Sequence, residues 1–177
     1  LKESNLQPKA IKAIAISAGP GSYTGLRIGT ATAKGLCYGW DIPLIAVPTL
    51  RILAERASDY LTDIQYIIPM IDARRMEVFT AIYRSDFSTE VAAHAEILTE
   101  TSFTSYLDQG KILFLGDGAS KFATICSHLN AVFVTDQYPS AQQMGKLAMN
   151  LYEKRQFEDI AYFEPFYLKE FYIAKNE

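Results

Sequence analysis

The 177-residue sequence has few of the residues that build redox, disulfide or metal sites. It holds only two cysteines and two histidines. Cys37 and Cys126 lie far apart with no CxxC spacing, so we expect two structural thiols. No apolar run approaches the roughly 20 residues that cross a bilayer, and the start lacks the basic-then-apolar pattern of a signal peptide. We therefore expect a cytoplasmic protein without a membrane span.

Motifs for nucleophilic or metal chemistry are also missing. His94 and His128 stand in unrelated segments, and the sequence contains no HExxH, no GxSxG and no cysteine with a matching histidine and asparagine. Asp72 and Glu77 are conceivable as paired carboxylates, but the neighbouring arginines favour a surface salt-bridge cluster. We expect no metal site and no catalytic residue.

Basic residues are dispersed. The formal net charge is −3, and lysines and arginines gather only at residues 9–12, 74–75 and 154–155. A protein that grips a polyanion by itself usually concentrates basic side chains on one face. Any contact with nucleic acid would therefore be shared with a partner.

The chain does contain ample material for a core, with 49% hydrophobic residues. In its first third, apolar runs predict strands over residues 11–17 and 43–47. Helical spacing predicts helices over residues 24–38 and 50–57. This alternation favours a parallel α/β layer with right-handed crossovers.

The pattern changes after residue 62. Two strands, 66–71 and 76–84, are separated by residues 72–75 as in a hairpin, and a third strand over 91–98 joins them. We divide the chain into two lobes, residues 1–62 and 63–177.

Further elements complete the second lobe. Thr99 is expected to cap a short helix, and a strand over 111–115 leads into the turn Gly116-Asp117-Gly118-Ala119. A helix over 121–128 and a strand over 131–135 follow. Ser140 and Gln143 predict a capping box that opens a helix ending near residue 155.

The most specific segment is a glycine turn between the first strand and the first long helix. This arrangement points free amides and a helix dipole toward an anion. However, it lacks the Lys-Ser/Thr of a Walker A loop and is not GxGxxG. We favour a strained turn whose glycines permit positive φ and close packing. The turn consists of Gly19, Pro20, Gly21, Ser22, Tyr23 and Thr24.

The helix after this turn carries small residues at three- and four-residue steps, which form one thin face. Two interpretations stay open: tight packing on the chain's own sheet, or the docking of a partner helix or second copy. The face comprises Gly25, Leu26, Ile28, Gly29, Thr32, Ala33 and Leu36.

The run GPGSYTGLRIGTATAKGL at residues 19–36 is very similar to the signature of the TsaB/YeaZ family. The similarity continues through IPL at 42–44, IDARRMEVF at 71–79, GDGA at 116–119 and PFYL at 165–168. These segments keep their order and cover essentially the whole chain.

The resemblance implies an α/β fold of the actin-like ATPase type (ASKHA, ribonuclease H-like), with two lobes around a cleft and the first strands of lobe one missing. It implies that Asp72 and Arg74 mark a phosphate hairpin whose glycine places are filled by arginines. Gly116 and Gly118 resemble a reduced adenosine turn. The nucleotide cleft is therefore expected to be degenerate and without a cofactor, ATP belonging to partner subunits.

The function implied is a non-catalytic scaffold of the bacterial machinery that makes threonylcarbamoyladenosine (t6A) in tRNA. It would pair with a TsaD homologue, with a TsaE-type ATPase joining the assembly and tRNA reached only through the complex. A homodimer is expected when the protein is alone, and no protease activity. The alternative is an independent ATPase or small-molecule kinase of the superfamily, which the arginine-filled hairpin disfavours.

Overall fold

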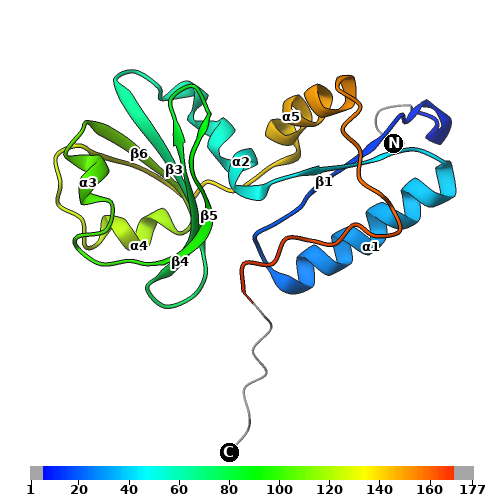
Figure 1. Ribbon diagram of the computed structural model, residues 1–177. Helices are drawn as coiled ribbons and strands as arrows, with labels where there is room; N and C mark the ends of the chain where they lie inside the picture. Colours follow the sequence, from blue (N-terminus) through cyan, green and yellow to red (C-terminus); the bar gives the residue numbers. More distant parts are fainter. Residues whose placement is uncertain (1–5, 170–177) are drawn as a thin grey trace, which may run out of the picture.

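Two lobes lie side by side in this computed structural model, which describes residues 6–169 (Figure 1). The first lobe is built on the parallel pair β1 (Ile14–Ser17) and β2 (Leu44–Val47). A short 3₁₀ helix, η1 (Pro8–Ala10), precedes β1. No helix in the described residues is long and apolar enough to cross a membrane.

Helix α1 (Tyr23–Trp40) covers one face of this pair. It begins after Ser22, whose hydroxyl accepts a hydrogen bond from the amide of Gly25, and ends at Asp41 in the left-handed conformation (φ 52°). Its buried residues recur at three- and four-residue steps, and two of them, Ala33 and Cys37, pack with Ile16 and Leu44. These are Leu26, Thr30, Ala33 and Cys37.

The second lobe holds a five-stranded sheet in the order β5-β4-β3-β6-β7. β3 pairs antiparallel with β4 and parallel with β6, so the expected hairpin at residues 72–75 is confirmed. The remaining pairs are β4 with β5, antiparallel, and β6 with β7, parallel. The strands are β3 (Ile64–Asp72), β4 (Glu77–Arg84), β5 (Thr89–Ile97), β6 (Lys111–Gly116) and β7 (Ala131–Thr135).

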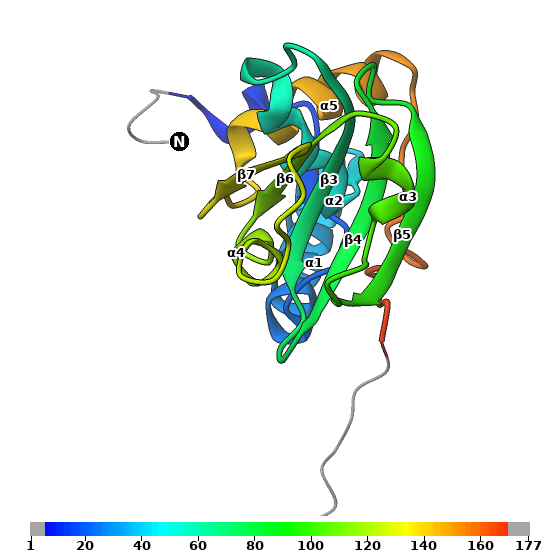
Figure 2. The same ribbon diagram turned by 90° about the vertical axis from the view of Figure 1, so that its left-hand side faces the viewer.

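Alternation along β6 gives this sheet two apolar faces. Leu113 and Leu115 pack toward α2 (Thr49–Ala54) and η2 (Glu55–Asp59). Ile112 and Phe114 point to the other side. There they pack beneath α3 (Thr104–Leu107) and α4 (Ala119–Ala123), on the face seen in Figure 2. The period-two pattern thus buries both sides of the strand.

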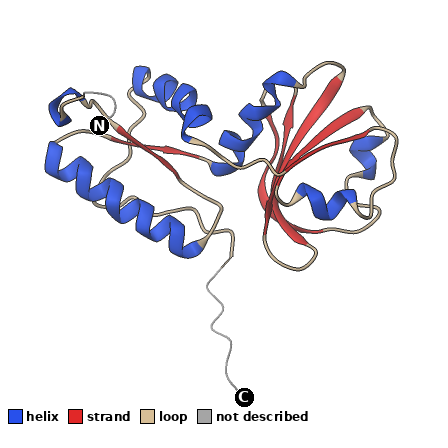
Figure 3. Cartoon of the chain, turned by 180° about the vertical axis from the view of Figure 1, so that it is seen from behind, coloured by secondary structure: helices blue, strands red, loops and turns tan. Residues whose placement is uncertain are grey.

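The chain returns to the first lobe after β7. Helix α5 (Ala141–Glu153) packs Ala148 against Ile45 and Val47, on the face of the β1–β2 pair opposite α1 (Figure 3). Residues 157–163 then pass beside β2, where the Glu158 amide donates to the Leu44 carbonyl at 2.9 Å. The division at residue 62 stays a prediction, but residues 141–163, which it assigns to the second lobe, pack on β2 of the first lobe.

Two local expectations in the second lobe were wrong. Thr99 does not cap α3; its amide donates to Ser102 Oγ, and the helix begins only after Phe103, which has φ 61°. Helix α4 starts directly at Ala119 and ends at Ala123, earlier than the expected span of 121–128. Ala119 and Phe122 are both fully buried at a three-residue step, so the buried face of the helix already begins at Ala119.

The predicted capping box at α5 does not form. The Ser140 hydroxyl bonds the side-chain oxygen of Gln143 and makes no cap hydrogen bond to a backbone amide. Ser140→Ala should therefore cost less than Ser22→Ala, whose lost cap is expected to lower the free energy of unfolding by about 0.5 to 2 kcal/mol. Urea denaturation of both variants measures the difference, and a larger loss for Ser140→Ala would contradict these cap assignments.

Candidate functional site

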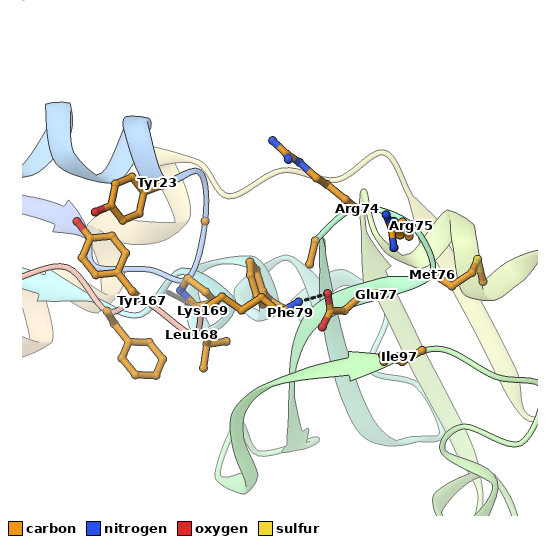
Figure 4. A pocket seen from close by; sticks show the side chains of 14 residues that line it. Tyr23, Arg74, Arg75, Met76, Glu77, Phe79, Ile97, Tyr167, Leu168 and Lys169 are labelled. Atoms are coloured by element: carbon orange, nitrogen blue, oxygen red, sulfur yellow. Dashed lines mark hydrogen bonds and ion pairs between the residues drawn. The ribbon is translucent and has the colours of Figure 1, made fainter. Parts of the chain in front are cut away.

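A cleft of about 780 Å³ lies between the two lobes (Figure 4). The first lobe contributes the turn with Pro20, Gly21 and Tyr23. The second contributes the hairpin at residues 73–77. Residues 166–169, called the strap here, form a third wall. The structure thus brings together the glycine turn and Arg74, which the sequence had placed at one site.

The glycine turn is fastened to the start of α2. The Gly19 amide donates to Thr49 Oγ1 at 3.0 Å, and the Thr49 amide returns to the Gly19 carbonyl at 2.9 Å. Gly19 has φ +114°, and an added Cβ would fall on the strap at Phe166. Ser22 caps α1, and Thr24 lies exposed in its first turn. Because the Gly19 amide is engaged, the contacts support a strained packing turn over an anion loop.

The strap ties the lobes together. The Phe166 amide donates to the Ala18 carbonyl at 2.7 Å, and the Tyr167 ring lies 4.8 Å from that of Tyr23. Lys169 reaches across and forms an ion pair with Glu77 of β4, as Figure 4 shows. The sequence singled out residues 165–168 only through the family resemblance and gave no sign that they line the cleft.

The carboxylates of the hairpin pair with lysines, so the expected arginine partners were wrong. Lys121 Nζ lies 2.7 Å from Asp72 Oδ1, which also accepts the Arg74 amide at 2.6 Å. Arg74 contributes its backbone here, not its guanidinium. Asp72 and Glu77 therefore serve as ion-pair partners of two lysines.

These contacts perturb the pKa of Asp72. Partial burial acts to raise the pKa of this carboxyl, but the hydrogen bond from Lys121, the Arg74 amide and the charge of Lys121 together hold it below its ordinary value. Because the pKa of Asp72 is lower in the folded state, the contacts of its carboxylate stabilise the fold at pH values above the unfolded pKa of about 3.9. That stabilisation is lost as the pH falls through the folded pKa.

Lys121→Met should therefore raise the pKa of Asp72, because it removes both the hydrogen bond and the charge and leaves the burial. Titration of the carboxyl carbon by NMR measures the change. Lys146→Met on α5 serves as a control of equal charge and should leave the Asp72 pKa unchanged. An unaltered Asp72 pKa in Lys121→Met would contradict the ion pair.

Gly116 and Gly118, expected at the cleft, are not among the residues that line it. Gly116 has φ +118°, and a Cβ there would fall on the Met70 backbone and 2.9 Å from Leu53 Cδ2. At Gly118 a Cβ would lie 2.9 Å from Val78 Cγ1. Both glycines therefore let the turn after β6 approach β3 and β4, which accounts for them without an adenosine.

The predicted partner face of α1 is divided. Leu26 and Ala33 point into the first lobe and are buried, so their assignment to a docking surface was wrong. The helix repeat of 3.6 residues places them on the inner stripe. The remaining members are exposed or half-buried: Gly25, Ile28, Gly29, Thr32 and Leu36.

Comparison with known proteins identifies the family. The sequence model of the TsaD family, described as tRNA N6-adenosine threonylcarbamoyltransferase, matches residues 1–175. TsaB of Bacillus subtilis (strain 168), a tRNA threonylcarbamoyladenosine biosynthesis protein, is 39% identical over 84 residues, which are 48% of this chain and 35% of the relative. TsaB of Haemophilus influenzae is 29% identical over 179 residues, or 96% of this chain and 75% of the relative.

The chain belongs to the TsaD family, in its TsaB/YeaZ branch. A solved structure from Pseudomonas aeruginosa, of a protein described as similar to peptidase YeaZ, superposes with a TM-score of 0.77 at 24% identity. The superposition covers 95% of this chain and 78% of the other. The expected α/β fold of the actin-like type is thereby confirmed.

The two histidines stand apart from the cleft residues. His94 Nε2 faces Glu96 at 3.8 Å, and His128 Nε2 faces Asp108 at 3.5 Å. Within residues 6–169, no group of three histidine, cysteine or acidic side chains is arranged to hold a metal ion. Cys37 is buried and Cys126 half-buried, and both are free thiols.

Proposed function

We propose that the chain is a non-catalytic scaffold subunit in the synthesis of threonylcarbamoyladenosine in tRNA and that it binds a TsaD homologue. The names of the TsaB relatives support the pathway. A TsaE-type ATPase would join the assembly, and tRNA would be reached through the complex, in keeping with the net charge of −3.

The glycines of α1 carry this proposal. A Cβ on Gly29 would meet only Ile16 Cδ1, at an ordinary 3.6 Å, and a Cβ on Gly25 would meet only Ser22, at 3.5 Å. Internal packing therefore does not require glycine at either place, although each costs a helix about 0.5 to 1 kcal/mol relative to alanine. Glycine at these two places would let the backbone of a partner approach α1 closely, which gives a reason for the lower helix stability. Ile28 beside them is 63% exposed, as an interface anchor would be.

The cleft supports the non-catalytic part. Asp72, the carboxylate that a superfamily ATPase would use, is held by Lys121 and by the Arg74 amide. The glycine places of the phosphate hairpin hold Arg74 and Arg75, whose side chains keep a phosphate from the backbone amides. ATP would then belong to the partner subunits, and this chain would need no cofactor.

The same exposed surfaces favour a homodimer when the partner is absent. β1 pairs only with β2 among the described strands, so one strand edge is open beside the α1 face. Light scattering after size-exclusion chromatography should give about twice the chain mass of 19.8 kDa. A monodisperse monomer at micromolar concentration would contradict the homodimer.

Two measurements test the scaffold function. Titration calorimetry with the TsaD homologue of the same organism should show a saturable complex, and its absence would overturn the proposal. Thermal unfolding with Mg-ATP should show no stabilisation, whereas a ligand at 100 times its dissociation constant would add about 2.7 kcal/mol. A clear shift, lost in Asp72→Ala, would favour the independent ATPase.

A further inference from the structure

Two arginines at the rim of the interlobe cleft lack an intramolecular acceptor. Arg74 and Arg75 both line the cleft, and neither guanidinium makes a hydrogen bond or ion pair within residues 6–169. Both residues have positive φ, 73° and 47°, which is uncommon outside glycine. Tight hairpin turns commonly require positive φ, and these two values belong to the turn between β3 and β4. Figure 4 shows both on the hairpin, across the cleft from Tyr167 of the strap.

The acidic groups nearby are already engaged. Asp72 accepts from Lys121 and from the Arg74 amide, and Glu77 pairs with Lys169. Asp117 Oδ1 accepts the Asp72 amide at 3.1 Å. The pairs Lys121–Asp72 and Lys169–Glu77 cancel in charge, whereas Asp117 keeps its negative charge. The two guanidiniums therefore leave an excess of about one positive charge at the hairpin, although the whole chain is acidic.

Apolar side chains lie exposed next to these arginines. Met76 is 37% exposed, Ile97 69% and Phe166 48%, and all three line the cleft. Arginine, methionine and aromatic residues are the types enriched at protein interfaces. A volume of about 780 Å³ is also within the range of ligand sites.

We propose that this cleft binds a protein segment in which carboxylates alternate with apolar side chains. Its carboxylates would bind Arg74 and Arg75, and its apolar side chains would pack on Met76, Ile97 and Phe166. Arginine forms bidentate hydrogen bonds with carboxylate, which fixes the segment in place. This surface adjoins the α1 face at Pro20 and Gly21, and the proposal rests on the scaffold function and extends it by a second contact.

Charge complementarity favours a protein segment over a nucleic acid. The Tyr23 ring already contacts the Arg27 guanidinium at 4.3 Å and the Tyr167 ring, so the cleft's tyrosines are stacked within the chain. Single-stranded nucleic acids need free aromatic faces and a continuous basic groove. The exposed aromatic side chain in this lining is Phe166, and the two free arginines stand next to each other on one hairpin, so they form no continuous basic groove.

Fluorescence anisotropy with the complete chain tests the site. The probe is a fluorescein-labelled peptide, Leu-Asp-Phe-Glu-Leu, and its match is the uncharged Leu-Asn-Phe-Gln-Leu. We expect saturable binding of the acidic peptide alone, weakened about tenfold or more in Arg74→Gln/Arg75→Gln, because charge-assisted hydrogen bonds are lost. Ile97→Ser should also weaken it.

Arg155→Gln is the control variant, because Arg155 is exposed, has φ 56° and lies outside the cleft. It should bind like the unchanged chain. Failure of the acidic peptide to bind, equal binding of both peptides, or unchanged binding in the double variant would each overturn the proposal. Tighter binding of a short oligouridine, lost in the double variant, would assign the cleft to nucleic acid and also overturn it. Because no TsaD homologue is present, these outcomes are independent of the α1 interface.

Discussion

Gly116→Ala should lower the free energy of unfolding by about 3 kcal/mol or more. Two effects contribute: backbone strain of roughly 1 to 3 kcal/mol and overpacking of roughly 1 to 3 kcal/mol. Gly116 has φ +118°, a conformation that alanine rarely adopts. The new methyl would also fall on the Met70 backbone and near Leu53, both fully buried. Neither neighbour has room to move. Urea denaturation with a constant m-value measures the loss.

Gly35→Ala is the matched control. Gly35 lies in the middle of α1 and has no atom within 4 Å of an added Cβ. Alanine there should raise the free energy of unfolding by about 0.5 to 1 kcal/mol, because glycine weakens a helix interior. If Gly116→Ala is as well tolerated as Gly35→Ala, the close approach of the turn to β3 is wrong.

Ile28→Glu should weaken binding to the TsaD homologue by more than about tenfold, or roughly 1.4 kcal/mol. Ile28 lies on the open face of α1 beside Gly25 and Gly29, where a buried charge without a partner would disrupt an apolar contact. The side chain is exposed in the free chain, so the stability should change by less than about 0.5 kcal/mol. Titration calorimetry gives the affinity.

Met149→Glu provides the comparison, since Met149 is 60% exposed on a helix of the same lobe. It adds the same charge on α5, so the general effect of charge on association is equal. Its affinity should match that of the unchanged chain. An equal loss of affinity for the TsaD homologue in both variants would show that α1 is not the specific interface.

Local patterns predicted those elements whose cause lies within a few residues. The strand 131–135 was placed at its observed bounds, and the hairpin at residues 72–75 was located by its turn and flanking apolar strands. The long helix was expected over 24–38 and found over Tyr23–Trp40. The sequence did not single out Ser22 as its cap, although serine at a helix start is the usual signal.

Contacts between distant segments were beyond sequence patterns. The helix that became α5 was predicted, but its location against Ile45 and Val47 depends on where the chain runs after β7. The pairs Lys121–Asp72 and Lys169–Glu77 join residues far apart, and adjacent arginines suggested other partners. Helix periodicity could have separated Leu26 and Ala33 from the outer face of α1, because both share the buried stripe with Cys37.

Reconstitution of tRNA modification tests the scaffold function most directly. The TsaD homologue, the TsaE-type ATPase, this chain, threonylcarbamoyl donor, ATP and tRNA would be combined, and threonylcarbamoyladenosine quantified after nuclease digestion. We predict product only when this chain and the TsaD homologue are both present, no product from this chain alone, and full activity with Asp72→Ala. Product formed at an unchanged rate without this chain, or by this chain without the TsaD homologue, would contradict the account.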